Sequence, residues 1–327
     1  MSEPVLDVSD LRVAFGAVEP VRGVSFALRA GERIGLVGES GSGKSLTALA
    51  IMRLARRARV SGHVQLAGED LLALSERAMT RVRGGRIAMV YQDPMAALNP
   101  VYTVGRQLRE ALELHTDLRR GAARERAVEL LADVGIERPR RRADQYPHEL
   151  SGGMRQRVVI AIAMCASPSV LICDEPTTAL DVTTQARVIE LLDRLAEDHG
   201  TAVVLITHDL GVAAGFCDAV HVMYGGRIVE SAGVERLYRS PVHPYTEALL
   251  AAAVDLRLEP GATIPTIPGH PPLAGELPTG CSFHPRCPVA RAVCSTQTPP
   301  LLRMGRRSAE CHFAVDRMAH STEELRA

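Results

Sequence analysis

The sequence predicts an α/β fold in which short buried strands alternate with helices. Residues 32–37 (ERIGLV) are typical of a buried strand, and residues 46–54, beyond a glycine-rich loop, are typical of a helix. Residues 170–173 and 202–207 are two further short apolar runs, and each is followed by carboxylates or histidine. Because ligands of open α/β sheets gather at the carboxyl ends of parallel strands, we expect a binding site where these segments end.

Length and composition are typical of a folded globular protein. The 327 residues suffice for one large domain or two, with 46% apolar and 23% charged residues. Acidic and basic residues balance at 38 each, which gives no indication of a polyanion partner, so we predict no nucleic-acid role. The longest apolar stretch, residues 158–166, is too short to cross a bilayer. The first residues lack the features of a signal peptide, so we expect a cytoplasmic location.

Residues 38–45 (GESGSGKS) match the phosphate-loop motif G-x-x-x-x-G-K-[ST] and contain the only lysine among the 38 basic side chains. The backbone N–H groups of such a loop and the positive end of the following helix converge on phosphate oxygens. Lysine offers a compact ammonium that lies between two phosphates, whereas the planar fork of arginine is too wide. Ser45 adds a hydroxyl ligand for Mg²⁺. The motif therefore predicts a phosphate-binding loop, which could serve a kinase, a GTPase or a motor.

Two carboxylates and a histidine follow the other two predicted strands. We expect Asp174 to hold Mg²⁺ through water and Glu175 to polarise the water that attacks the γ-phosphate. The alternative is that both acids only keep the strand end soluble. His208 follows residues 202–207, where a histidine at the end of a parallel strand reaches a γ-phosphate, although histidines at strand ends are often structural or exposed.

The segment Leu150-Ser151-Gly152-Gly153-Met154 precedes a predicted helix over residues 155–166. With it, residues 1 to about 250 resemble an ATP-binding subunit of an ATP-binding cassette (ABC) transporter. Most of that family has LSGGQ where this chain has LSGGM. The backbone N–H groups of this signature and the helix dipole are retained, so the resemblance implies that it binds the γ-phosphate of an ATP held by another chain.

The resemblance also implies roles for other single residues. Phe15 resembles the aromatic residue that stacks on adenine, although an isolated phenylalanine is more often part of a core. Gln92 resembles the glutamine that senses Mg²⁺ and the transmembrane partner, and His208 resembles the switch histidine. The implied set comprises Phe15, Gly38, Ser40, Gly41, Gly43, Lys44, Ser45, Leu46, Gln92 and Asp174 for ATP, Ser45 and Gln92 for Mg²⁺, Glu175 and His208 for catalysis, Ser151, Gly152, Gly153 and Met154 for the ATP of the other chain, and Ala179, Leu180 and Asp181 for the dimer loop.

Two further segments resemble the oligopeptide, dipeptide and nickel importer branch, namely residues 93–100 (DPMAALNP) and 243–250 (HPYTEALL). The resemblance implies an ATPase (ATP + H₂O to ADP + phosphate) that drives import of di- or oligopeptides, with nickel or another small solute as the alternative cargo. It implies a second ABC ATPase subunit, more often a paralogue than an identical copy, two transmembrane permease subunits and an extracytoplasmic solute-binding protein. The chain would lie peripherally on the cytoplasmic face of the membrane.

Seven cysteines fall into two groups. Cys165, Cys173 and Cys217 lie singly in apolar surroundings and are expected to pack as small hydrophobes. The other four, Cys281, Cys287, Cys294 and Cys311, follow the spacing C-x5-C-x6-C-x16-C. Four thiols close together suggest ligation of Zn²⁺ or an iron–sulfur cluster, and the spacing alone does not choose between them. The resemblance to the peptide-importer tail implies a [4Fe-4S] cluster, with Zn²⁺ or free thiols as alternatives.

The predicted organisation is a nucleotide-binding domain over residues 1–240 and a C-terminal extension over residues 241–327. The first is a RecA-like core with an antiparallel β subdomain near its start and an inserted helical subdomain at about residues 93–153. The second begins with an extended connector, since six prolines lie between Pro260 and Pro278, and ends in a small cysteine-bearing domain. Two rival functions are a non-transport ABC ATPase, which usually has two cassettes or a long coiled coil, and a module that senses redox state or metal.

Overall fold

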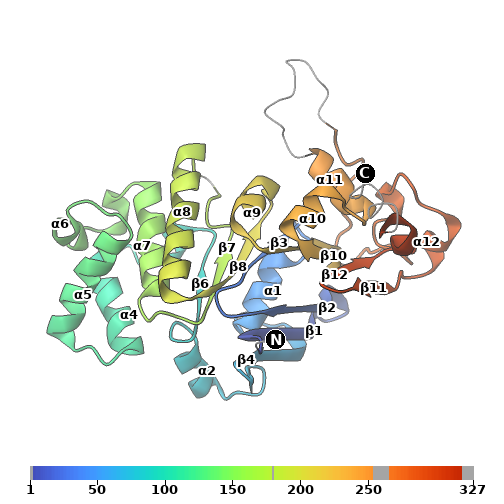
Figure 1. The fold of residues 1–327 in the computed structure, drawn as a ribbon. Coiled ribbons are helices and arrows are strands. Elements are labelled where there is room, and N and C mark those ends of the chain that lie inside the picture. Colours follow the sequence, from blue (N-terminus) through green and yellow to red (C-terminus); the bar gives the residue numbers. More distant parts are fainter. Residues whose placement is uncertain (1–2, 179, 253–264, 319–327) are drawn as a thin grey trace. The chain divides into compact units, whose positions relative to one another are not determined.

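The structure is a computed structural model that describes residues 3–178, 180–252 and 265–318 (Figure 1). The chain divides into two compact units, each built from several chain segments. The first unit comprises residues 1–6, 27–32 and 65–206, and the second comprises residues 7–26, 33–64 and 207–327. Within the described ranges, no helix is long and apolar enough to span a membrane.

The first unit contains a parallel sheet in the order β6-β7-β8. The sheet consists of β6 (Ile87–Val90), β7 (Val170–Asp174) and β8 (Ala202–Thr207), and the unit also contains the two-residue strand β5 (Glu69–Asp70). In the register of this sheet, Ile87 and Ala202 both lie opposite Val170. Every residue of β7 and β8 is buried, as expected for strands that are covered on both faces. The strands predicted at residues 170–173 and 202–207 are therefore present.

Most helices of the first unit precede β7 in the chain. They are α2 (Glu76–Val82), α3 (Pro94–Ala97), α4 (Val104–His115), α5 (Arg120–Asp133), α6 (Pro139–Ala143), the 3₁₀ turn η1 (Pro147–Glu149), α7 (Gly152–Met164) and α8 (Val182–His199). Helix α4 is amphipathic, with Val104, Leu108 and Leu112 buried along one face. Helix α7 begins before the predicted residue 155, because the Ser151 hydroxyl accepts the Met154 N–H and caps the helix at residue 152.

The second unit contains two sheets, in the orders β2-β1-β4 and β11-β12-β10-β9-β3. Strands β3 and β9 are parallel, and the other pairs of the second sheet are antiparallel. The strands are β1 (Leu6–Phe15), β2 (Val18–Leu28), β3 (Arg33–Val37), β4 (Arg59–Leu66), β9 (Ala219–Tyr224), β10 (Arg227–Gly233), β11 (Leu301–Met304) and β12 (Arg307–Glu310). The helices are α1 (Lys44–Ile51), α9 (Leu210–Phe216), α10 (Val234–Arg239), α11 (Pro244–Ala252), η2 (His284–Arg286) and α12 (Ala292–Thr296).

The C-terminal extension belongs to the same compact unit as the phosphate loop, so the expected separate cysteine-bearing domain is not found. Strand β12 joins β10 by pairing Ala309 with Glu230. Residues 265–280 form neither helix nor strand, as their prolines predict, and residues 253–264 of the connector lie outside the described ranges. Two buried clusters pack the extension, one aromatic (Tyr224, Tyr245, Phe283) and one aliphatic (Val242, Ala309, Ala314, Met318).

Candidate nucleotide-binding site

The phosphate loop connects β3 to α1 and needs its glycines for steric reasons. Gly38, Gly41 and Gly43 have φ of 151°, 79° and 104°, in the left-handed region that side chains disfavour. A side chain at Gly38 would collide with the carbonyl oxygen of Met223, and a Cβ at Gly43 would lie 2.8 Å from the carbonyl oxygen of Pro20. The backbone of the loop therefore lies close against neighbouring backbone, with Ser40 and Gly41 at its exposed tip.

Lys44 is folded over this loop. Its side chain is almost fully buried, with 5% of the residue exposed. The ammonium Nζ donates to the carbonyl oxygens of Gly38 (2.8 Å) and Glu39 (3.0 Å) and to the hydroxyl of Ser42 (3.4 Å). The compact ammonium thus contacts several acceptors within one loop, and its place between two phosphates stays a prediction. Ser45 and Leu46 follow in the first turn of α1.

The acidic pair lies where β7 ends. Asp174 is buried as the last residue of the strand, opposite Ile206 of β8. The carboxylate of Glu175 accepts one hydrogen bond from the Gln92 amide (2.9 Å) and one from the Thr178 hydroxyl (2.8 Å), both on Oε2. The structure thus brings together Gln92 and Glu175, two predicted site residues that are 83 positions apart. The hydroxyl of Thr178 was not among the predicted ligands, although its place three residues after Glu175 is a usable signal.

The backbone of Glu175 is strained. Its φ is 45°, in a region that costs a residue with a side chain about 1–2 kcal/mol. The Glu175 N–H is held by the carbonyl oxygen of Ile206 at 2.9 Å. Backbone strain of this kind concentrates at functional positions, where the surrounding structure fixes one geometry.

The signature segment lies at the amino end of α7, and one of its two glycines is tightly packed. Ser151 and Gly152 are exposed. A Cβ at Gly153 would lie 2.8 Å from Cγ2 of Thr184, so α7 begins close to the start of α8. Asp181 caps α8 by accepting the Thr184 N–H at 2.9 Å. Leu180 precedes this cap, and Ala179 lies outside the described residues.

Phe15 and His208 lie in the second unit. Phe15 ends β1 and is 40% exposed, which argues against the alternative that it belongs to the core. His208 is exposed immediately after β8, and the next residue, Asp209, caps α9 by accepting the N–H groups of Gly211 and Val212. Their positions leave both rings accessible, and their roles stay predictions.

Comparison with known proteins places these features in one family. Residues 21–178 match the family described as "ABC transporter", and residues 229–294 match "Oligopeptide/dipeptide transporter, C-terminal region". A probable peptide ABC transporter ATP-binding protein of Sinorhizobium fredii is 51% identical over 304 residues, which are 91% of each chain. The chain belongs to the ABC transporter family.

Other ABC proteins agree with this assignment. The oligopeptide transport ATP-binding protein OppD of Salmonella typhimurium is 49% identical over 91% of this chain and 90% of its own length. OppD of Mycobacterium bovis is 52% identical over 91% of this chain but only 50% of its own length, so the chain spans half of that relative. The ATP-binding cassette MJ0796, in a dimeric structure with ADP and Pi, is 28% identical with a TM-score of 0.63 over 70% of this chain and 98% of its own. These matches confirm the predicted P-loop ABC fold.

The prediction of a metal site in the C-terminal extension is wrong. Cys281, Cys287, Cys294 and Cys311 are free thiols, and among the described residues no group of three or more histidines, cysteines or carboxylates is placed to hold a metal ion. Burial raises the pKa of Cys281 to about 11 and also raises the pKa of Cys287 and Cys311. These side chains are therefore protonated thiols near neutral pH. Neither a [4Fe-4S] cluster nor Zn²⁺ fits the residues as they lie.

The other three cysteines behave as predicted. Cys165, Cys173 and Cys217 are buried among apolar side chains of the ABC fold. Burial raises the pKa of Cys165 to about 11 and that of Cys217 to about 12, so both are inert, uncharged thiols that pack as small hydrophobes.

The sequence did not indicate a role for three residues that lie in or beside the phosphate loop. The carboxylate of Glu39 forms a two-pronged ion pair with the guanidinium of Arg286, and the Glu39 N–H donates to the Tyr245 hydroxyl. Glu39 is one of the variable positions of the phosphate-loop motif, Tyr245 lies within the HPYT segment, and Arg286 precedes Cys287. The only signal in the sequence was that HPYT and the cysteine segment occur in the same extension.

Proposed function

We propose that this chain binds ATP and hydrolyses it to ADP and phosphate as the ATP-binding subunit of a membrane importer of di- or oligopeptides. The observation that carries the proposal is the geometry of Glu175, whose carboxylate is oriented by Gln92 and Thr178 directly after the buried Asp174. A carboxylate held in this way at the end of a parallel strand is suited to accept a proton from water. The peptide cargo is supported by the names of the relatives.

In the proposed mechanism, the loop around Lys44 binds the phosphates. The N–H groups at the start of α1 and the Lys44 ammonium carry the positive charge that the β- and γ-phosphates need. Ser45, Gln92 and Asp174 provide the oxygen donors that Mg²⁺ prefers, and the ion, when bound, neutralises charge on the transferring phosphoryl group. Phe15 supplies an accessible ring for adenine stacking, and His208 an imidazole for the γ-phosphate.

Glu175 acts on the attacking water. The Gln92 amide and the Thr178 hydroxyl both bind its Oε2, so the carboxylate keeps one orientation. A carboxylate in a fixed orientation is suited to accept the proton of a water aligned with the γ-phosphate. After phosphoryl transfer to this water, the products are ADP and inorganic phosphate. The residues that hold Glu175 raise turnover by positioning it.

The exposed signature supports the proposed association with a second ATPase subunit in an importer. Ser151 and Gly152 are exposed at the amino end of α7, where they are available to the ATP of a second ABC subunit, with Leu180 and Asp181 beside them in the dimer loop. We infer that this partner is a paralogue, that two permease subunits bind near Gln92, and that a solute-binding protein delivers the cargo. The chain then lies peripherally on the cytoplasmic membrane face, with residues 1–240 as the nucleotide-binding domain.

Uptake by the reconstituted transporter tests the proposal. With the full complex in lipid vesicles, labelled di- or oligopeptide uptake should require ATP, and Ni²⁺ should neither be taken up nor compete. Glu175→Gln should abolish uptake while ATP still binds, whereas Glu197→Gln, an exposed carboxylate on α8, should leave uptake unchanged. Ni²⁺ uptake would favour the nickel alternative. Unchanged ATP turnover with Glu175→Gln and the corresponding change in the partner ATPase subunit would refute the role of Glu175.

A further inference from the structure

Glu39 of the phosphate loop is held by the C-terminal extension. Its carboxylate accepts from both terminal nitrogens of Arg286, at 2.7 and 3.0 Å. Its N–H donates to the Tyr245 hydroxyl at 2.9 Å. Its carbonyl oxygen accepts from Nζ of Lys44 at 3.0 Å. One residue therefore connects two side chains of the extension to the phosphate-binding lysine.

The side chain of Arg286 is held in one position by its neighbours. It is only 5% exposed and projects from the short turn η2. The Nε atom donates to the carbonyl oxygen of Pro268 at 2.8 Å, and Nη1 lies 3.4 Å from the hydroxyl of Tyr224. Hydrogen bonding to Glu39 raises the pKa of Arg286, so the guanidinium keeps its charge. A buried, two-pronged pair of this kind fixes both distance and direction.

Tyr245 is fixed from two sides. Its ring is fully buried, with centroids 4.6 Å from Tyr224 and 5.3 Å from Phe283. Its N–H donates to Nδ1 of His243 at 3.0 Å. Burial lowers the pKa of His243 to about 3, so the ring is neutral and able to accept this bond. The tyrosine hydroxyl therefore presents a fixed acceptor to the loop.

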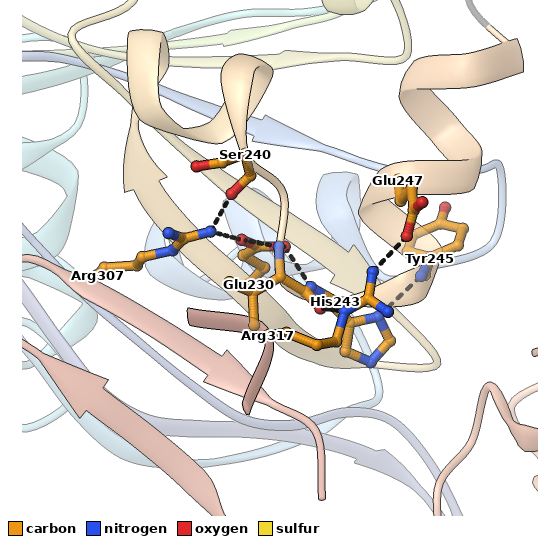
Figure 2. A network of polar contacts seen from close by, with 8 residues as sticks. Glu230, Ser240, His243, Tyr245, Glu247, Arg307 and Arg317 are labelled. Carbon is orange, nitrogen blue, oxygen red and sulfur yellow. Dashed lines mark hydrogen bonds and ion pairs between the residues drawn. The ribbon is translucent and has the colours of Figure 1, made fainter. Parts of the chain in front are cut away.

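The HPYT segment that carries Tyr245 is itself tied to the last strand of the extension (Figure 2). The fully buried carboxylate of Glu230 accepts the N–H groups of Val242 and His243, at 2.9 and 2.8 Å, and pairs with Arg307 of β12. Arg317 donates to the carbonyl oxygen of Val242 and pairs with Glu247 of α11. Polar groups buried to this extent are stable only when partnered, so this network sets one position for the segment.

The position of these contacts favours a role in placing the phosphate loop over a purely structural role. They fall on the residue whose carbonyl oxygen binds the Lys44 ammonium, so a displacement of Glu39 displaces a partner of that ammonium. The Glu39 carboxylate also lies in a loop predicted to bind phosphate, where an uncompensated negative charge repels the ligand. Arg286 supplies the compensating charge.

We propose that Arg286 and Tyr245 are positioning residues for the phosphate loop, and that by fixing Glu39 the C-terminal extension sets the affinity of this loop for a nucleoside triphosphate. The inference rests on the proposed ATP-binding function. It assigns to the HPYT segment and to η2 a direct part in nucleotide binding. The extension then tunes the ATP site from within its own chain.

Nucleotide binding by variants of the full chain tests this role. Affinity is measured by displacing a fluorescent ATP analogue with Mg-ATP, alongside the thermal unfolding midpoint. Arg286→Gln should weaken binding roughly tenfold, which is typical of coupling between sites, and Tyr245→Phe should weaken it by a smaller factor. Glu39→Gln/Arg286→Gln should bind more tightly than Arg286→Gln, because no uncompensated carboxylate remains. The matched control Arg227→Gln breaks the 2.8 Å ion pair to Glu310, which includes neither Glu39 nor Lys44, and should leave affinity within about twofold.

Three outcomes separate the possibilities. Lower unfolding midpoints with unchanged affinity in both Arg286→Gln and Tyr245→Phe would make the contacts structural only and overturn the inference, as would tighter binding. Tyr245→Phe removes a single hydroxyl and should fold, so the test stands even where Arg286→Gln does not. If Lys44→Ala binds the analogue as well as the unchanged chain, the proposed ATP-binding function itself fails, whatever the result for Arg286.

Discussion

Two carboxylates of the candidate site, Glu175 and Glu39, are held by opposite means. The carboxylate of Glu175 accepts hydrogen bonds from an amide and a hydroxyl, two uncharged donors that orient it. The carboxylate of Glu39 is paired with the guanidinium of Arg286, which orients it and compensates its charge. A carboxylate that must accept a proton needs the first arrangement, whereas one that only fixes a loop is suited by the second. The kind of donor thus indicates the role of each acid.

Replacing each acid in turn by glutamine tests this difference in role most directly. Glu175→Gln should lower kcat for ATP hydrolysis by about 10²–10⁴, the usual contribution of a general base, with little change in KM. Glu39→Gln should change KM for ATP more than kcat, because Glu39 acts on binding. Steady-state ATPase assays of the assembled transporter measure both constants. A kcat loss in Glu39→Gln as large as that in Glu175→Gln would erase the distinction.

Acid should weaken the network that holds Glu39. Burial, reinforced by the nearby Arg317, lowers the pKa of His243 to about 3 from 6.5. Between these values the unfolded chain binds a proton that the folded chain does not, so stability falls as pH falls, by at most about 1.4 kcal/mol per pH unit. His243→Asn keeps a side-chain acceptor but does not titrate. Denaturant unfolding from pH 7 to 4 should show a shallower acid slope for this variant.

A matched substitution isolates the effect of burial. His148→Asn replaces an exposed histidine of the first unit and should leave the acid slope as it is in the unchanged chain. An equal flattening in both variants would mean that the slope comes from the general loss of histidine charge and not from the buried ring of His243.

The local features of the site could be predicted from sequence, and the long-range ones could not. Residues 38–45 specify the loop by themselves, because their glycines and the single lysine act within a few positions of one another. Gln92 and Glu175 were each predicted singly, and the sequence did not indicate that their side chains touch. The contacts of Glu39 join residues 206 and 247 positions apart. With arginine at every basic position but one, no charge pattern marks Arg286 as special.

The cysteine prediction failed for a related physical reason. Spacing along the chain places thiols in one region but does not specify whether they converge on one point. In the described structure the four C-terminal thiols do not form a metal-binding group, and burial raises the pKa of Cys281, Cys287 and Cys311. The arginine beside Cys287, and not the cysteine itself, makes the contact with the phosphate loop.

Removal of the hydrogen-bond donors to Glu175 should have the next smaller effect on kcat. Thr178→Val and Gln92→Leu each remove one hydrogen bond to Oε2, and each should lower kcat about tenfold, since a hydrogen bond to a charged group contributes about 1.5–3 kcal/mol at most. Because Thr178 acts through Glu175, Thr178→Val should not lower kcat further in a Glu175→Gln background, whereas Gln92→Leu, which also removes a proposed Mg²⁺ ligand, should. Single-turnover ATP hydrolysis measures these effects. A further loss in Thr178→Val/Glu175→Gln would show an independent role for the hydroxyl.

The smallest expected effect separates the Glu39–Arg286 ion pair from the contacts that hold Arg286 in place. Tyr224→Phe removes a hydroxyl that lies 3.4 Å from Nη1 of Arg286, the longest contact on that nitrogen, and leaves the ring in its edge-on packing with Phe283. Arg286 keeps its two bonds to Glu39 and its bond to Pro268. ATP affinity, measured by analogue displacement, should therefore change less than about twofold, because this 3.4 Å hydrogen bond is long and contacts Arg286 and not Glu39. A loss as large as that of Tyr245→Phe would mean that the whole aromatic cluster, and not the two contacts on Glu39, sets the position of the loop.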